Sequence, residues 1–263
     1  MNTVTSRDGT KIAFDRWGEG PALILVGGAT ATRAASAQSA EDLAKQFTVY
    51  TYDRRGRGDS GDTAPYAVER EIEDLDAIIG EAGGSANVFG HSSGAVLALR
   101  AAAAGLDIPK LAVYEPPFIT DDSRAPVPND FVEHLDELTA EGRRDDAVAY
   151  FMRAAVGIPD EFIEQMKDSP MWEPSVEVAH TLAYDGRIMG DTMSGKPLSA
   201  EPWASIAIPT LVMYGGASEP FMHNGAKALA GHIPNAQHRT LEGQDHGPAG
   251  DVLNPMLEEF FTG

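Results

Sequence analysis

The stretch Gly90-His91-Ser92-Ser93-Gly94 decides how the rest of the chain is interpreted. It follows an apolar run, 86–89, and leads into an alanine-rich run, 95–104, so the sequence predicts a strand, a sharp turn and a helix with a serine at the apex. In such a turn the serine backbone is strained, and only small residues fit two positions to either side. Gly90 and Gly94 meet that requirement. The pattern therefore favours Ser92 as a nucleophile.

Composition limits the class of protein and its partners. The 263 residues suit one α/β domain with a large insertion. Forty acidic against 20 basic residues give a net charge of −20, which argues against nucleic acid or an anionic membrane as a partner and favours a small-molecule substrate. Without cysteine, disulfides and thiolate nucleophiles are excluded. No signal peptide or apolar run of ~18 residues is visible, so we expect a cytoplasmic location. The oligomeric state stays open.

Outside one segment, strands and helices alternate along the chain. Two short antiparallel strands open the sheet, and the continuously apolar runs that follow are typical of strands covered on both faces. The expected strands are 3–6, 11–17, 22–26, 47–52, 86–89, 110–114, 208–214 and 237–241. The expected covering helices are 34–45, 68–82, 95–104, 222–230 and 252–261. We predict a mostly parallel eight-stranded sheet flanked by helices.

The segment 118–202 departs from this rhythm and contains helical patches joined by loops rich in Pro, Gly and Met. Because it follows the carboxyl end of a strand, we expect it to cover the place where open α/β sheets bind ligands, as a helical cap on a core of 1–117 and 203–263. Met171, Trp172 and Tyr184 of this segment are candidate pocket residues, as is Gly28 in the glycine loop after the third strand.

Three arginines, Arg54, Arg55 and Arg57, follow the fourth strand and could form a phosphate clamp. Aspartates lie beside them at positions 53, 59 and 62, so a turn held by internal ion pairs is the preferred interpretation.

Taken together, these features resemble the α/β-hydrolase superfamily over essentially the whole chain. The resemblance lies in the glycine-ended third strand, the serine turn, a cap after the sixth strand, an acid after the seventh and His246 after the eighth. The capped esterase and lactonase branches are closest in appearance. One departure is Gly27-Gly28 at the end of the third strand, where many relatives carry His-Gly.

The resemblance implies a catalytic triad. Serine needs a general base, and His246 alone of the seven histidines lies in a loop just past a terminal strand, where the superfamily places its base. For the acid, the spacing Gly216-Ala217-Ser218-Glu219-Pro220 favours Glu219. Counting from Gly215 instead places Ser218 at that position, which keeps Glu115, at the end of the sixth strand, as the alternative acid.

The expected chemistry is hydrolysis of a small carboxylic ester or lactone through an acyl-enzyme, without a metal or cofactor. Backbone N–H groups of Ala29 and Ser93 are the candidate oxyanion hole. Serine at position 92 speaks against the epoxide hydrolases and dehalogenases of this fold, which use a carboxylate nucleophile. The alternatives are a C–C bond hydrolase, a cofactor-free haloperoxidase-like or lyase-like enzyme, and a non-catalytic ligand-binding protein.

Overall fold

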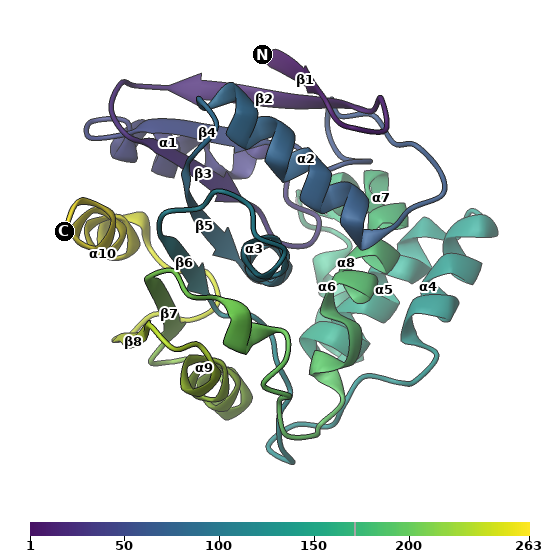
Figure 1. Ribbon diagram of the computed structural model, residues 1–263. Helices are drawn as coiled ribbons and strands as arrows, with labels where there is room; N and C mark the ends of the chain where they lie inside the picture. The colour runs from purple at the N-terminus through teal and green to yellow at the C-terminus, as the bar shows by residue number, and fades with distance from the viewer. Residues whose placement is uncertain (171) are drawn as a thin grey trace.

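The computed structural model describes residues 1–170 and 172–263, and within them eight strands form one sheet in the order β1-β2-β4-β3-β5-β6-β7-β8 (Figure 1). The first two strands pair antiparallel and the other six run parallel, so the predicted fold class is confirmed. The strands are β1 (Asn2–Thr5), β2 (Lys11–Trp17), β3 (Ala22–Val26), β4 (Thr48–Tyr52), β5 (Asn87–His91), β6 (Leu111–Tyr114), β7 (Thr210–Gly215) and β8 (Ala236–Leu241).

Helices cover both faces of this sheet because alternate strand residues point to opposite sides. In β3, Ile24 and Val26 join the larger apolar cluster, while Leu23 and Leu25 join the smaller one. Helices α2, α3 and α9 pack on the larger cluster, and α1 and α10 pack on the smaller one (Figure 1). These helices are α1 (Ala37–Leu43), α2 (Val68–Glu81), α3 (Ser93–Ala103), α9 (Pro220–His232) and α10 (Gly250–Thr262).

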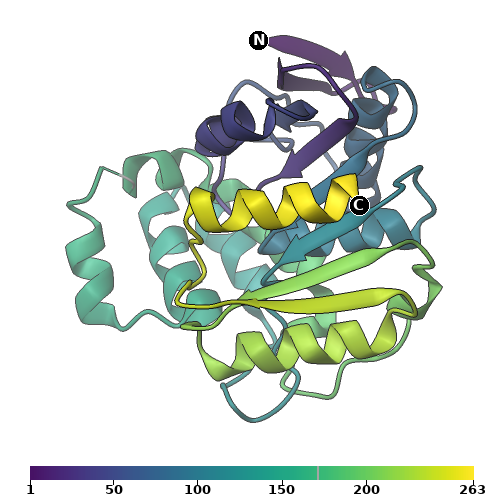
Figure 2. The same cartoon turned by 90° about the vertical axis from the view of Figure 1, so that its left-hand side faces the viewer.

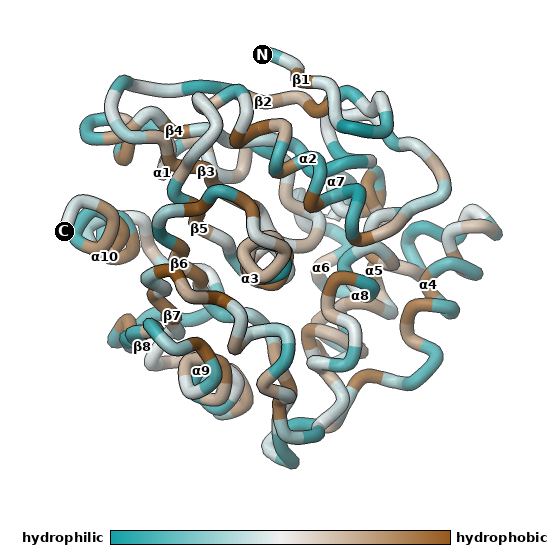
Figure 3. Tube along the Cα trace, viewed as in Figure 1, coloured by the Kyte–Doolittle hydropathy of each residue, from teal (hydrophilic) through white to brown (hydrophobic). Residues whose placement is uncertain are grey.

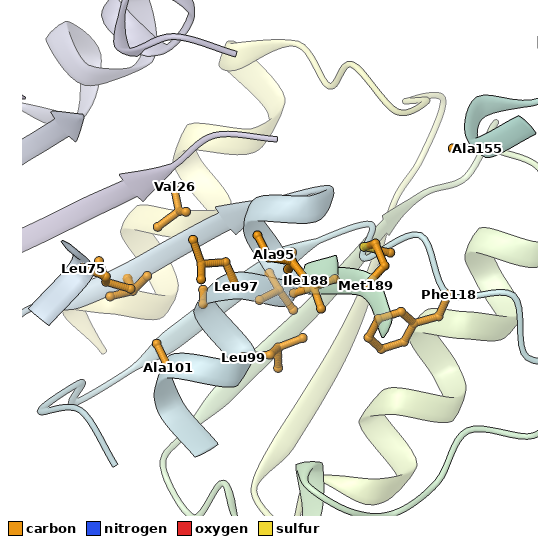
Figure 4. Close-up of a cluster of buried hydrophobic side chains, with 14 of the residues drawn as sticks. Val26, Leu75, Ala95, Leu97, Leu99, Ala101, Phe118, Ala155, Ile188 and Met189 are labelled. Carbon is orange, nitrogen blue, oxygen red and sulfur yellow. The ribbon is translucent and has the colours of Figure 1, made fainter. Parts of the chain in front are cut away.

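Helix α3 is the central element of the larger cluster. Its side chains are almost all buried, and Leu97 and Leu99 lie between the sheet and the segment that carries Ile188 and Met189 (Figure 4). Helix α2 is amphipathic instead, and its hydropathy alternates along the tube in Figure 3. One helix therefore sits inside the molecule and the other forms part of its outer layer.

The chain between β6 and β7 is largely helical, as predicted, and lies to one side of the sheet (Figure 2). A short 3₁₀ turn, Ala179–Thr181, separates the last two α-helices of this segment. A π-helical turn, Met152–Val156, follows the second helix of the segment. The helices are α4 (Phe131–Ala140), α5 (Arg144–Phe151), α6 (Asp160–Met166), α7 (Trp172–Glu177) and α8 (Leu182–Met189). We call the segment 118–202 the cap.

Among the described residues, no helix combines the length and the apolar character that crossing a bilayer requires.

Candidate active site

Ser92 occupies the turn between β5 and α3 with a φ of 56° and a ψ of −126°. The positive φ is unusual for a residue with a side chain, and the close packing of the neighbouring backbone holds it in place. A Cβ at Gly90 would lie 2.6 Å from the Cα of Ala95, and one at Gly94 would lie 2.4 Å from the carbonyl oxygen of Gly27. Both glycines are therefore required, for the steric reason that the sequence pattern indicated.

His246 and Glu115 complete a hydrogen-bonded chain with this serine. His246 lies in the loop after β8, and its Nε2 is 3.1 Å from Ser92 Oγ. On the other side of the ring, Nδ1 is 2.7 Å from Oε2 of Glu115, which immediately follows β6. The three side chains come from the carboxyl ends of three different strands. The arrangement has the geometry of a nucleophile, a general base and an acid that orients the base.

The carboxylate of Glu115 is fully buried, and each of its oxygens has a hydrogen-bond partner. Its Oε1 accepts the backbone N–H of Gly215 at 2.7 Å, which leaves Oε2 for the imidazole. Burial alone would raise the pKa of Glu115, but its hydrogen bonds, of which that from His246 has the largest effect, together outweigh burial and hold the pKa below its ordinary value. Glu115 is therefore ionised at neutral pH, as the orienting acid must be.

Glu219, which the sequence favoured as the acid, lies elsewhere, and this preference is corrected. Strand β7 extends through Gly215, so the expected position of the acid is counted from that glycine. That count reaches Ser218, and Glu219 lies one residue beyond it. It is the exposed residue immediately before α9, in an extended conformation with a φ of −62° and a ψ of 150°. In the structure, His246 is hydrogen-bonded to Glu115, which is the alternative acid that the sequence left open.

His91 contacts the backbone and the ring of His246. Its Nε2 is 2.8 Å from the carbonyl oxygen of His246, and the centres of the two rings are 4.8 Å apart. Burial lowers the pKa of His91 to about 4, so the ring is neutral at pH 7, and its Nε2–H donates to the carbonyl. Asp245 fastens the same loop by accepting the N–H of Gly247 at 2.9 Å.

The glycine loop after β3 passes directly beside the nucleophile. A Cβ at Gly28 would lie 2.9 Å from the Cβ of Ser92, so only glycine allows this approach. The carbonyl oxygen of Gly28 accepts Nη1 of Arg57 at 2.5 Å. Because a trans peptide directs its C=O and N–H to opposite sides, this bond turns the N–H of Ala29 away from Arg57. Ala29 and Ser93 both line the main cavity together with Ser92, as an oxyanion hole requires.

The arginines after β4 form a buried ionic cluster behind that loop. Arg54 pairs with Glu71 of α2 at 2.7 Å and with Asp185 of α8 at 2.8 Å, and Arg57 pairs with the other oxygen of Asp185 at 2.7 Å. Asp185 also accepts the hydroxyl of Ser93 at 2.7 Å. We call Arg54, Arg57, Glu71 and Asp185 the buried ionic cluster, in which two positive charges balance two negative ones.

The expected structural role of these arginines agrees with this geometry, but the expected partners were wrong. Asp53 and Asp59 both pair with Arg33, and Asp62 accepts the hydroxyl of Tyr184 at 2.8 Å. Arg55 reaches Asp74 and Asp8 instead. Most of the partners thus lie on helices α2 and α8, and Asp8 lies in the turn between β1 and β2.

A cavity of about 700 Å³ lies between the cap and the carboxyl ends of the strands. Its lining includes all three residues of the hydrogen-bonded chain, and most of its other walls are apolar. The larger apolar side chains are Phe131, Phe151, Phe162, Met189, Met193 and Phe221. The volume is within the range of small-molecule sites.

A protein-family model described as the alpha/beta hydrolase family matches residues 23–255, which include the serine turn, Glu115 and His246. The chain belongs to this family. A solved alpha/beta hydrolase from Sphaerobacter thermophilus is 58% identical and superposes with a TM-score of 0.93, covering 99% of this chain and all of the other. The family and the fold are thus shown by sequence and by structure.

Two further comparisons are more distant. An N-formylmaleamate deformylase from Pseudomonas putida is 33% identical over 138 residues, about half the length of each protein. The crystal structure of an enol-lactonase from Burkholderia xenovorans is 20% identical, with a TM-score of 0.75 and full coverage of both chains. The second shares the fold with this alpha/beta hydrolase.

The candidate pocket residues of this alpha/beta hydrolase mostly lie outside the main cavity. Trp172 is buried in the cap, where its Nε1 donates to Asp145 at 2.9 Å. Tyr184 stacks on Tyr66 with ring centres 3.8 Å apart. Gly28 supports the nucleophile and lines a smaller cavity, and Met171 lies outside the described residues. The expectation that Trp172 and Tyr184 line the pocket is therefore corrected. Apolar spacing shows which face of a helix is buried, but it does not show whether other side chains or a cavity cover that face.

Sequence reasoning missed two charged residues of the alpha/beta hydrolase site. Asp185 lies within an otherwise mostly apolar run of α8, and an acid on a buried helix face was a usable signal for an internal ion pair. Arg124, in the loop after β6, lines the cavity and had no comparable signal. In residues 1–170 and 172–263, His, Asp and Glu nowhere gather in a group of three that could hold a metal ion.

Arg57→Met tests whether Arg57 positions the oxyanion loop. Losing one oxyanion donor typically costs 10²–10³ in kcat, and a donor that is misdirected but present should cost less, about 10- to 100-fold. We expect kcat and the affinity for a boronic acid transition-state analogue to fall together, with KM little affected. Arg55→Met removes a buried arginine from the same turn without touching Gly28. Equal losses in kcat for the two folded variants would mean that Arg57 only stabilises the turn.

Proposed function

We propose that this protein is a serine hydrolase that cleaves a small carboxylic ester or lactone through an acyl-enzyme. One observation carries the proposal: Ser92 Oγ, both nitrogens of His246 and the carboxylate of Glu115 form one continuous chain, with separations of 3.1 and 2.7 Å. A serine hydroxyl is a weak nucleophile at neutral pH, and this chain provides the base that removes its proton.

The steps follow from the positions of the atoms. Nε2 of His246 takes the proton of Ser92 as Oγ attacks the acyl carbon, and the same nitrogen then returns it to the departing alcohol oxygen. Glu115 keeps the other ring proton on Nδ1 and stabilises the imidazolium. The N–H groups of Ala29 and Ser93 receive the negative oxygen of the tetrahedral intermediate. Water repeats the sequence on the acyl-enzyme and releases the acid.

The relatives support the reaction class more than the substrate. The family match supports hydrolysis, and the intact chain of Ser92, His246 and Glu115 speaks against the non-catalytic alternative. The haloperoxidase-like and lyase-like alternatives share this fold and are tested by the same substrate panel. C–C bond hydrolysis on the same three residues stays an alternative. A second candidate, hydrolysis of an amide such as an N-formyl group, is favoured by the 33% identity to a deformylase over half the chain. A panel of esters, lactones and N-formyl amides separates these candidates.

A fluorophosphonate probe tests the nucleophile directly. We expect a single adduct on Ser92, located by peptide mass spectrometry, because an activated hydroxyl beside oxyanion donors reacts far faster than an ordinary serine. Ser92→Ala should remove the adduct. Folded protein that stays unlabelled, or is labelled on another serine, would contradict the proposal.

A further inference from the structure

The cavity that contains Ser92 also contains one permanent cation. Among its described lining residues, Arg124 is the only arginine, and no lysine contributes. Most of the acids that share the lining are already engaged. Glu115 binds His246, Asp185 binds two arginines, and Asp245 accepts the N–H of Gly247. Arg124 is therefore a charged donor within a largely apolar chamber.

Arg124 is held in place without a carboxylate partner. Its guanidinium lies over the ring of Phe221, with 4.7 Å from Cζ to the ring centre, and Nη2 makes only a long contact of 3.5 Å with the carbonyl oxygen of Ala154. A Cβ at Gly157 would lie 2.9 Å from Nη2, so this glycine, with a φ of +88°, leaves room for the guanidinium. The position is packed from three sides, which reduces the entropy lost on binding a ligand.

The fully buried arginines of the turn after β4 have carboxylate partners, which Arg124 lacks within residues 1–170 and 172–263. Arg54, Arg55 and Arg57 each form at least one ion pair with an acid at 3.0 Å or less. Within the described part of the chain, no acid approaches Arg124 within ion-pair distance, although it is half-buried. Burial lowers its pKa, and the longer-range attraction of Glu219 opposes that effect only in part. The guanidinium of Arg124 has five N–H donors, and among the residues that the structure describes only the carbonyl oxygen of Ala154 accepts from it, over a long distance. It can therefore still bind an anion through two parallel hydrogen bonds.

We propose that Arg124 binds a carboxylate on the substrate, at the end remote from the bond that Ser92 attacks. This inference rests on the proposed function for the reaction, and it adds the substrate class: an ester or lactone that also carries a free acid group. The largely apolar walls of the cavity that Ser92 and Arg124 both line suit the hydrocarbon that separates the two groups. An anionic substrate has to enter a protein of net charge −20, which makes a dedicated cation in the cavity more necessary.

Paired substrates test this specificity. Monomethyl succinate, glutarate and adipate are compared with the neutral esters in which an amide replaces the free acid. A charged hydrogen-bonded pair in a partly buried site contributes about 10- to 100-fold in kcat/KM, and we expect the acid to be preferred by that factor in the best-fitting pair. In Arg124→Gln the preference should disappear, and Arg124→Lys should restore part of it.

Two further variants separate direct binding of the carboxylate by Arg124 from the electrostatic effect of other charged residues. Arg143, an exposed cap arginine outside the cavity lining, pairs with Glu141 and Asp146, so Arg143→Gln should leave the ratio of acid to amide unchanged. Glu219→Gln removes the acid that attracts Arg124, and we expect it to increase the preference for the acid. A wild-type enzyme that prefers the amide, or a preference that survives Arg124→Gln, would overturn the proposal.

A binding measurement keeps this inference distinct from the reaction. Calorimetry with glutarate and with its diamide, which carries no carboxylate, requires no turnover, and Ser92→Ala can be used. Glutarate binding that depends on Arg124 supports the carboxylate site even if no ester is hydrolysed, in which case the proposed function alone fails. Hydrolysis of neutral esters with no glutarate binding overturns the carboxylate site and leaves the serine hydrolase intact.

Discussion

Glu115→Gln should lower kcat by about 10³- to 10⁴-fold, as removal of the charge on a triad acid does in serine proteases. The N–H of Gly215 will keep the amide oxygen on its own side, where Oε1 lies now. The amide nitrogen then faces Nδ1 of His246 and donates to it, so the ring carries its proton on Nε2. A protonated Nε2 cannot accept the proton of Ser92.

The control for this variant is Glu219→Gln, which removes the acid that the sequence favoured. Because Glu219 is exposed and makes no recorded bond to His246, we expect kcat to fall by less than about tenfold on a neutral ester. Circular dichroism and thermal melting must show that both variants fold, since Glu115 is fully buried. A nearly inactive Glu219→Gln beside an active Glu115→Gln would restore the sequence-based assignment.

Asp185→Asn should reduce the free energy of unfolding by about 3–5 kcal/mol, the usual cost of removing one partner from a buried ion pair. The variant leaves Arg54 and Arg57 in the interior with the single charge of Glu71. Urea denaturation measures the change. A loss below about 1 kcal/mol would mean that water reaches the cluster and screens it.

The matched control is a second ion pair of the cap, which is partly exposed. Arg187 of α8 pairs with Asp136 of α4, and the two side chains are 35% and 46% exposed. Asp136→Asn should cost less than about 1 kcal/mol, because solvent screens such a pair and the side chains lose entropy on forming it. The contrast between Asp185 and Asp136 therefore isolates the effect of burial.

At acidic pH, the difference in unfolding free energy between the wild type and Asp185→Asn should become smaller. Burial would raise the pKa of Asp185, but Arg57 and Arg54 more than offset this and hold it below its ordinary value of 3.8. A carboxyl group with a lowered folded-state pKa stabilises the protein above its unfolded pKa, and this stabilisation is lost as the pH falls through the folded value. The difference in unfolding free energy should thus be constant near neutral pH and shrink below about pH 4.

The sheet and the serine turn were predictable because their signals are local. A strand buried on both faces is apolar throughout, and the serine turn needs glycines at fixed distances from Ser92. Each strand and the serine turn depend on a few consecutive residues. His246 was identified through the resemblance to the α/β-hydrolase superfamily, which places its base in the loop after the last strand.

The acid and the cavity were not predictable because they depend on where separate elements meet. The choice between Glu115 and Glu219 depended on whether β7 ends at Tyr214 or Gly215, a single residue. Arg57 and Asp185 are 128 positions apart in sequence, so no local pattern could pair them. The rotation of each cap helix, which decides whether an aromatic side chain lines the cavity or packs beneath it, is set by contacts between helices.

The bond between Asp185 and the two arginines also limits how the cap can be exchanged. Replacing 118–202 with the cap of another enzyme of this fold is an obvious way to change specificity, because the cap supplies much of the cavity wall. A foreign cap without a carboxylate at the position of Asp185 would leave Arg54 and Arg57 under-compensated beneath it. It would also remove the anion that holds Arg57 against the carbonyl of Gly28. A working chimera must therefore bring its own buried acid, because replacing Arg57 would also release the carbonyl of Gly28, so this cap is not an independent module.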